Sequence, residues 1–283
     1  MVPSPAIAGS VRRLSTLAWA SAAVLLALYL VMVRTEWGQA VADGAFLARL
    51  SEARVLRTLD KRFLESIDVW VFLAGGLLLI LAAALRHRWR AGLVVAVAYA
   101  LAIVSAEALK LLLPRPILAA AFEESMGTKA GLNTFPSGHT TFATALVLGL
   151  VLLVAPRVRV PVAIVGTGLM IVVAGGVVTA GWHRPTDAFG GVALGSAWMA
   201  VTAAALLARR GTPGVRLRAE HLIPLVGAGL AALASIVLVA LLRHPEVTGS
   251  LTLMVIKVTL FACILTVVSV FSAAVGGSDL SEN

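Results

Sequence analysis

The stretch Asn133–Thr141 reads Asn-Thr-Phe-Pro-Ser-Gly-His-Thr-Thr and leads into an apolar run. Pro136 and Gly138 interrupt regular structure, so the stretch is predicted to be a tight turn that opens a helix. The first N–H groups of a helix lack partners within it and lie at the positive end of the helix dipole, where phosphate binds well. Ser137 adds a hydroxyl group, and His139 can transfer a proton near neutral pH. Alone the turn is weak evidence, because serine before a helix usually only caps it.

The composition around this turn is that of an integral membrane protein. Of the 283 residues, 60% are hydrophobic and only 13% are charged, whereas soluble domains carry roughly 25% charged residues. We therefore assign the net charge of +9 to basic residues at the membrane surface, which attract anionic lipid headgroups. No basic stretch is interleaved with aromatic residues, so nucleic acid is not an expected partner. The predicted fold class is all-α, a bundle of membrane helices.

Eight apolar runs are long enough to be predicted as membrane spans. The first is longer than the core of a signal peptide, roughly 7–15 residues, so it is interpreted as an uncleaved anchor. Residues 1–210 are expected to form the core, and residues 211–283 to add two helices and a short tail. The predicted spans are Leu14–Val33, Ile67–Leu85, Ala91–Leu113, Thr140–Ala155, Val160–Gly181, Ala188–Ala208, Leu222–Leu242 and Leu251–Val275.

A long polar connection, residues 34–66, follows the first span. Its apolar residues recur at near-helical spacing among basic ones, which predicts an amphipathic helix lying on the membrane surface. Such a helix could cover a site, but an interfacial connector is the simpler interpretation. The apolar positions are Phe46, Leu47, Leu50, Val55, Leu56, Leu59 and Phe63.

The distribution of arginine in the short loops sets the predicted orientation. With a cytoplasmic N-terminus, most loop arginines lie inside, as the positive-inside rule requires. The basic 34–66 connection departs from this rule, and lying flat on the surface would account for it. On this assignment the protein resides in a bacterial cytoplasmic membrane, and the Ser137–Gly138–His139 turn faces the periplasm or the exterior.

A second polar cluster ends the third span, where Lys110 is followed by Pro114-Arg115-Pro116. A lysine at the end of an apolar helix often only extends to the interface. An arginine held between two prolines, however, presents a fork that suits phosphate oxygens. Glu107, one turn before Lys110, is predicted to be its ion-pair partner.

A third cluster, Gly181-Trp182-His183-Arg184-Pro185-Thr186-Asp187, ends the fifth span. A carboxylate at the spacing of Asp187 can hold the imidazole of His183 in one tautomer and stabilise its charged form. The alternative is a surface contact of little consequence. Because all three clusters fall on the same side of the membrane in this topology, the functional interpretation is favoured.

At these residues the sequence resembles the PAP2 superfamily, the type 2 phosphatidic acid phosphatases. The family pattern is Lys…Arg-Pro, then Pro-Ser-Gly-His, then Ser-Arg…His-x-x-x-Asp. Here these elements are similar to Lys110…Arg115-Pro116, Pro136–His139 and His183…Asp187. The resemblance covers roughly the first six spans, and the ordered set of three is much more specific than any one element.

Two positions depart from the family pattern. Four residues separate Lys110 from Arg115, where the family commonly has six. The Ser-Arg pair of the third element would fall at Gly176 and Val177, so the phosphate-binding arginine expected there is absent. Arg184 is a hypothetical replacement that would approach the phosphate from another direction.

The resemblance implies hydrolysis of a phosphomonoester or diphosphate through a phosphohistidine, without a metal or other cofactor. His183 would be the nucleophile, oriented by Asp187, and His139 the general acid and base. The clusters lie where helices meet headgroups, so the substrate should be an amphiphile: phosphatidate, phosphatidylglycerophosphate, or a polyprenyl phosphate or diphosphate. The residues expected to bind its phosphate are Lys110, Arg115, Ser137, Gly138 and Arg184.

Other interpretations remain open at this point, among them a pore or scaffold, which no sequence feature favours. Another is a non-catalytic protein that binds or moves lipid phosphates with a decayed site, which the missing Ser-Arg pair favours. A transporter could use Lys257 in the last span, since charge at membrane depth is often functional. The two histidines and Asp187 could also ligate a metal, but the surrounding cationic residues would repel it. No sequence feature selects among the lipids or sets an oligomeric state.

Overall fold

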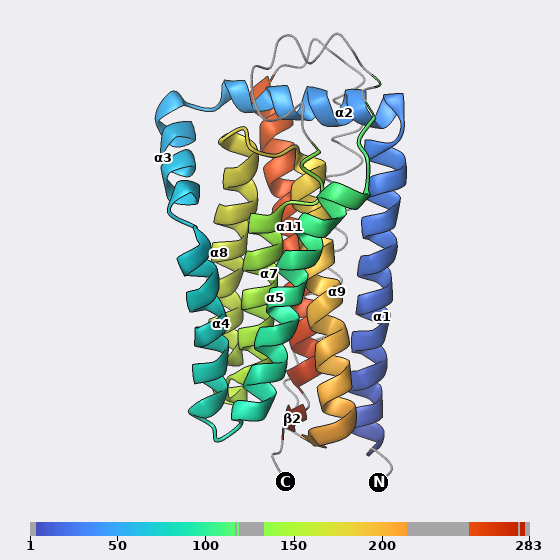
Figure 1. The fold of residues 1–283 in the computed structure, drawn as a ribbon, viewed down its shortest axis with the longest axis vertical. Helices are drawn as coiled ribbons and strands as arrows, with labels where there is room; N and C mark the ends of the chain where they lie inside the picture. Colours follow the sequence, from blue (N-terminus) through green and yellow to red (C-terminus); the bar gives the residue numbers. More distant parts are fainter. Residues whose placement is uncertain (1–3, 117, 119–132, 214–248, 277, 281–283) are drawn as a thin grey trace.

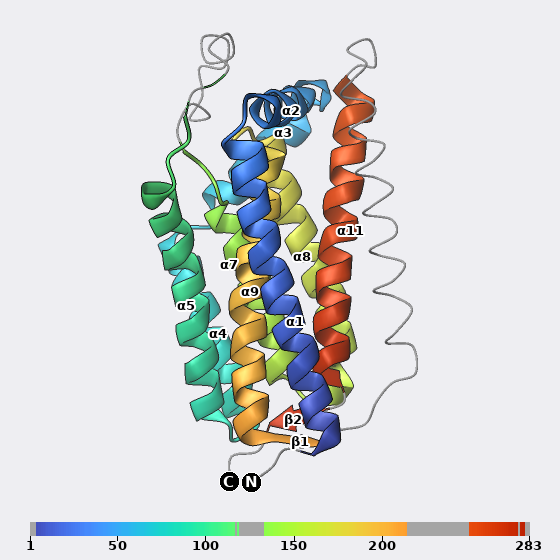
Figure 2. The ribbon, with the colours of Figure 1, turned by 90° about the vertical axis from the view of Figure 1, so that its right-hand side faces the viewer.

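The computed structural model of the chain describes residues 4–116, 118, 133–213, 249–276 and 278–280. They form an all-α bundle whose long helices run along one common axis (Figures 1 and 2), which confirms the predicted fold class. The elements are α1 (Pro5–Ala27), η1 (Leu28–Val33), α2 (Glu36–Leu47), η2 (Ala48–Ser51), α3 (Arg54–Glu65), α4 (Val69–Ala84), α5 (Trp89–Leu112), α7 (Gly138–Leu153), η5 (Pro156–Val158), α8 (Arg159–Thr179), α9 (Pro185–Arg210), β1 (Gly211–Pro213), α11 (Gly249–Gly276) and β2 (Ser278–Leu280).

Five described helices are long and apolar enough to cross a bilayer, as an integral membrane protein requires. They comprise α1 with η1, α5, η5 with α8, α9 and α11. The pair α3 and α4 would count as a sixth span, although it is bent by 65° at its break. The predicted span Leu222–Leu242 lies outside the described residues.

Helix α7 is shorter, at 16 residues, and forms the centre of the bundle. All of its residues except His139 and Leu150 are buried or nearly so, because α4, α5, α8 and α9 pack around it. An apolar helix of a membrane protein is covered either by lipid or by other helices, and α7 is covered by helices. The position of His139 is therefore fixed by neighbours on all sides of its helix.

The first helix begins earlier than predicted, at Pro5 rather than at Leu14. The side chain of Ser4 caps its N-terminus, and proline is well suited to the first helical position. Ile7, Ser10 and Leu14 then lie buried on one face, so the polar start of the chain is an extension of the span.

The 34–66 connection is not a single helix lying flat, as predicted, but two helices with a turn between them. Helix α2 crosses the end of the bundle, and α3 then turns along α8 (Figure 1). The Thr179 hydroxyl at the end of α8 donates a hydrogen bond to Asp60 of α3. The outer face of α3 still exposes Val55, Leu59 and Phe63, in keeping with the amphipathic pattern.

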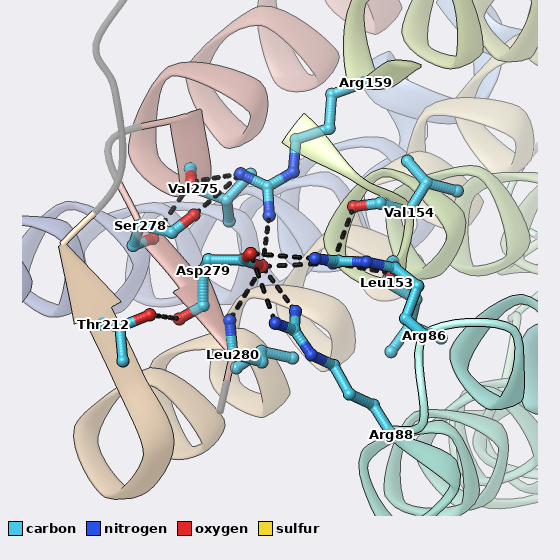
Figure 3. Close-up of polar contacts among 10 residues, drawn as sticks. All are labelled: Arg86, Arg88, Leu153, Val154, Arg159, Thr212, Val275, Ser278, Asp279 and Leu280. Carbon is cyan, nitrogen blue, oxygen red and sulfur yellow. Dashed lines mark hydrogen bonds and ion pairs between the residues drawn. The ribbon is translucent and has the colours of Figure 1, made fainter. Parts of the chain in front are cut away.

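At the opposite end of the bundle, the carboxylate of Asp279 forms ion pairs with three arginines (Figure 3). Strand β2 pairs with β1 in antiparallel register, and its Asp279 lies 2.9 Å from Arg86, 2.5 Å from Arg88 and 3.6 Å from Arg159. Burial alone would raise the pKa of Asp279, but hydrogen bonds from Arg86 and Arg88 lower it well below its ordinary value. Because the arginines come from the α4–α5 turn and the start of α8, Asp279 fastens the C-terminal segment to both.

Replacing Asp279 by asparagine would keep its shape while removing the carboxylate charge that pairs with all three arginines. We expect the free energy of unfolding to fall by about 1–3 kcal/mol, measured by thermal unfolding in detergent. Glu65→Gln is the matched control, because it removes only an exposed pair with Lys61 and should change stability by less than about 0.5 kcal/mol. Equal stability of the two variants would contradict this account.

Candidate functional site

The three predicted clusters lie at the same end of the bundle, the end that α2 crosses (Figures 1 and 2). They occupy the C-terminus of α5, the N-terminus of α7, and the junction of α8 with α9. Stretches that are distant in sequence thus lie at one end of the bundle. The contacts described below link all three clusters.

Asp187, in the first turn of α9, is completely buried and links two of the clusters to the turn before α7. Its carboxylate accepts a hydrogen bond of 2.5 Å from the Thr134 hydroxyl and one of 3.1 Å from the main-chain N–H of Arg184. Its other oxygen lies 3.5 Å from Arg115. The main-chain carbonyl of Asp187 accepts the N–H of Ser137 at 2.9 Å. Asp187 therefore fixes the relative positions of these segments.

His183 lies just beyond α8 with its side chain buried. Its Nδ1 atom is 3.6 Å from Oδ2 of Asp187, and its main-chain N–H donates to the carbonyl of Val177. Gly181 makes the preceding turn possible, because its φ of +77° is accessible mainly to glycine. Since Nδ1 faces Asp187, Nε2 is the ring nitrogen directed away from the carboxylate.

His139 lies in the first turn of α7 between two aromatic rings. Its ring centroid is 5.9 Å from that of Phe72 and 5.4 Å from that of Trp182, both in edge-on geometry. Trp182 directly precedes His183 in the chain. The two histidines are thus carried by adjoining segments, and the aromatic contacts hold the His139 ring in place.

Lys110 lies against the start of α7. Its Nζ atom is 2.7 Å from Oε1 of Glu107, which confirms the predicted i, i+3 pair. A Cβ atom placed on Gly138 would come within 2.6 Å of the same Glu107 oxygen and 3.7 Å of Nζ. Gly138 therefore allows the ion pair to approach the backbone of the turn. Asn133 reinforces this contact by donating to the main-chain carbonyl of Lys110 at 2.7 Å.

Arg115 follows α5, and its side chain is almost wholly buried. Burial lowers the pKa of its guanidinium, although the nearby charge of Asp187 opposes this shift. Nη2 of Arg115 is buried without a hydrogen-bond partner among the described residues. Arg115 thus has one nitrogen near Asp187 and another still able to bind an anion.

Ser137 has the capping role that is usual for serine before a helix. Its side chain is completely buried and caps α7 by accepting the N–H of Thr140 at 3.4 Å. Its own N–H is engaged by Asp187, so the expectation that this N–H is open to phosphate is wrong. The N–H of Gly138, at the first helical position, is an anion-binding candidate of the turn.

Helix α2 covers this end of the bundle and contacts Arg184. The guanidinium of Arg184 donates to Asp43 of α2, and both side chains are buried. Gln39 of α2 donates to the carbonyl of Pro116 at 2.6 Å and accepts the N–H of Leu118. Helix α2 therefore lies over residues of the predicted site, as the alternative interpretation of this connection expected.

The positions of the absent Ser-Arg pair, Gly176 and Val177, lie near the end of α8. A Cβ atom on Gly176 would lie 3.7 Å from Leu64 and 3.8 Å from Asp60, so α3 packs directly on this part of α8. Across the described ranges, no three His, Cys, Asp or Glu side chains are grouped as a metal site requires.

Residues 89–211 match the PAP2 superfamily. The resemblance drawn from the three motifs is thereby confirmed, and the PAP2 region contains all three clusters from Lys110 to Asp187. Searches of curated proteins and of solved structures found no match. Helices α1 to α4, including the α2 cover, lie before the PAP2 region, and α11 lies after it.

Close packing of α9 on α7 sets the distance between the two histidine-bearing segments. A Cβ atom on Gly191 of α9 would lie 2.6 Å from the Ser137 carbonyl oxygen and 2.8 Å from Cβ of Thr140. Both atoms belong to the rigid start of α7 and have little room to move. Gly191 is therefore required for the close approach of these helices.

Gly191→Ala should force α7 and α9 apart and lower the free energy of unfolding by about 1–3 kcal/mol. The measurement is thermal unfolding in detergent. Gly175→Ala in α8 is the control, because nothing lies within 4 Å of the added methyl group. An unchanged melting temperature for Gly191→Ala would show that the helices are not packed as described.

Proposed function

We propose that the protein is a membrane phosphatase that hydrolyses a phosphomonoester or diphosphate of an amphiphile through a phosphohistidine. The observation that carries the proposal is the buried Asp187 beside Nδ1 of His183, with Arg115 on its other oxygen. A carboxylate so placed favours the tautomer in which Nε2 is unprotonated and nucleophilic. The PAP2 match supports a phosphatase-type family.

In the first step Nε2 of His183 attacks phosphorus, a P–N bond forms, and the bond from phosphorus to the leaving oxygen breaks. His139 donates a proton to that oxygen, while Asp187 stabilises the positive charge on His183. In the second step His139 accepts a proton from water, which attacks phosphorus and breaks the P–N bond. Inorganic phosphate and free His183 result. Covalent catalysis thus replaces one difficult displacement with two easier ones.

Fixed positive charge would stabilise the phosphoryl oxygens in both steps. Lys110, the unpartnered Nη2 of Arg115 and the N–H of Gly138 are the groups that the geometry offers for this purpose. Such preorganised electrostatic groups often supply the largest catalytic contribution. We propose no metal for this chemistry.

The substrate we propose is amphiphilic, because the site lies at the end of a bundle of apolar helices. Phosphatidate, phosphatidylglycerophosphate and polyprenyl phosphate or diphosphate all combine a phosphate headgroup with a chain that can lie in the bilayer. The proposed orientation places the site at the outer face of a bacterial cytoplasmic membrane, as the arginine distribution favours.

The wild-type protein in detergent should release phosphate from at least one lipid of that panel, with a chelator present throughout. His183→Ala should abolish release, because the proposed P–N bond forms at Nε2 of His183. The measurement is inorganic phosphate released over time. Activity that depends on added metal, or that survives in His183→Ala, would contradict the mechanism.

A second candidate function is binding or movement of lipid phosphates without hydrolysis. The absence of an arginine at Gly176 and Val177 favours it. The transporter interpretation has weaker support, because Lys257 of α11 forms an ion pair with Glu52 beside η2 rather than lining a described polar pathway. A wild-type protein that binds lipid phosphates but never releases phosphate would favour the non-catalytic alternative.

If Arg184 replaces the missing arginine, Arg184→Ala should reduce activity as much as Arg115→Ala. Asp43→Asn separates this role from the contact with α2, because it weakens the contact but keeps the guanidinium. We expect kcat/KM to fall in both arginine variants by about tenfold or more, and by less in Asp43→Asn. A nearly normal Arg184→Ala enzyme would exclude Arg184 as the replacement.

A further inference from the structure

Arg49 of η2 lies beside the turn that carries His183. The residue is 9% exposed. A Cβ atom on Gly181 would lie 3.1 Å from its Nε atom and 3.3 Å from Cζ, so the guanidinium rests on the backbone two residues before His183. The mechanism above does not use this arginine.

Arg49 has no anionic partner among the described residues. Its Nε atom is buried without a hydrogen bond, and the same is true of Nε in Arg57 of α3. The contact that Arg49 does make is with the ring of Phe46, whose centroid is 4.3 Å from Cζ. A cation–π contact of this kind compensates only part of the lost hydration of a buried guanidinium.

Arg57 adds a second positive charge to the same place. Burial lowers the pKa of Arg49, and the charge of Arg57 lowers it further, as expected for two neighbouring cations. The nearby acidic side chains contact other groups: Asp43 binds Arg184, Glu52 binds Lys257, and Asp60 accepts the Thr179 hydroxyl.

Arg57 also lies one helical turn before Asp60, the residue of α3 that packs where α8 lacks an arginine. It is three residues before Asp60, so the two share a face of α3. Asp60 is the residue that packs on Gly176 and Thr179 at the end of α8. Helix α3 thus carries a guanidinium toward the part of the site that the third motif leaves without one.

We propose that Arg49 and Arg57 bind the phosphate group of the substrate, as a second cationic pair in addition to Lys110 and Arg115. The inference rests on the proposed function and deepens it, because it assigns phosphate recognition to η2 and α3, outside the PAP2 region. Two guanidinium groups offer the planar, multiple donors that suit phosphate or diphosphate oxygens. A bound phosphate would also relieve the repulsion between them.

The test is binding of inorganic phosphate and pyrophosphate to the purified protein in non-ionic detergent, by titration calorimetry. Arg49→Gln and Arg57→Gln should each weaken binding by about tenfold or more. Arg62→Gln, an exposed position on the same helix, is the matched control and should bind as the wild type does. Unchanged affinity in both test variants, or no binding by the wild type, would overturn the inference.

If Arg49→Gln does not fold, Arg49→Lys retains the charge but loses the fork, and it should still bind more weakly than the wild type. An unchanged affinity of Arg49→Lys for phosphate and pyrophosphate would then contradict the proposed phosphate site of Arg49 and Arg57. Folding of each variant is checked by its melting temperature without added anion.

Two further arms separate this inference from the proposed function. His183→Ala should lose phosphatase activity but keep Arg49-dependent binding. A wild type that binds pyrophosphate through Arg49 yet hydrolyses nothing would refute the proposed function while leaving the anion site in place.

Competition identifies the source of the bound phosphate. Pyrophosphate should compete with the lipid phosphate in the wild type and do so more weakly in Arg49→Gln. Binding through Arg49 without competition would mean that the pair holds another anion, such as a bulk lipid headgroup, and would overturn the substrate assignment.

Discussion

The carboxylate of Asp187 is the constraint on which the geometry of this site depends. A buried negative charge is costly unless it is paired and hydrogen-bonded. Here the compensation comes from residues distant in sequence: the Thr134 hydroxyl, the Arg115 guanidinium and the main-chain N–H of Arg184. The same carboxylate faces His183. Satisfying one charge therefore positions the end of α5, the turn before α7 and the start of α9 together.

The helical scaffold gives this polar arrangement its rigidity. Helix α7 is enclosed by its neighbours, and α9 approaches it closely at Gly191, where a larger side chain would collide with backbone. The far end is held separately by Asp279 and its three arginines. Polar contacts thus fasten both ends of the bundle, and apolar packing fills the region between them.

The apolar runs predicted the bounds of most spans to within a few residues, because a membrane helix needs a long, nearly uncharged apolar segment. The three polar clusters were equally predictable, since each interrupts an apolar run. The early start of α1 was missed because Ser10, Arg12 and Arg13 break its apolar pattern, although Ser4 and Pro5 signal a helix start. Thr134 lies within the stretch Asn133–Thr141, but its hydrogen bond to Asp187 could not be predicted from the spacing of residues in the sequence.

The contributions of α2, η2 and α3 could not be predicted, for a physical reason. Asp43, Arg49 and Asp60 lie more than a hundred residues from their contacts in α8 and the following turn. Their local sequence is that of an ordinary amphipathic segment, in which basic residues usually face solvent. Only the folded arrangement distinguishes the buried Arg49 from the exposed Arg62. The pattern predicts a surface connector, and it does not show that α2 also contacts residues of the predicted site.

Because α2 covers the site, the PAP2 region cannot be separated from the N-terminal helices without losing contacts to the site. The matched segment holds every motif residue, yet the contacts of Arg184 and Pro116 with Asp43 and Gln39, and that of Pro114 with Tyr29, reach outside it. Grafting residues 89–211 onto a foreign membrane anchor would transfer the motif without its cover. The smallest transplantable unit accordingly starts at the first helix, and chimeras among related sequences should exchange the N-terminal segment and the motifs as one piece.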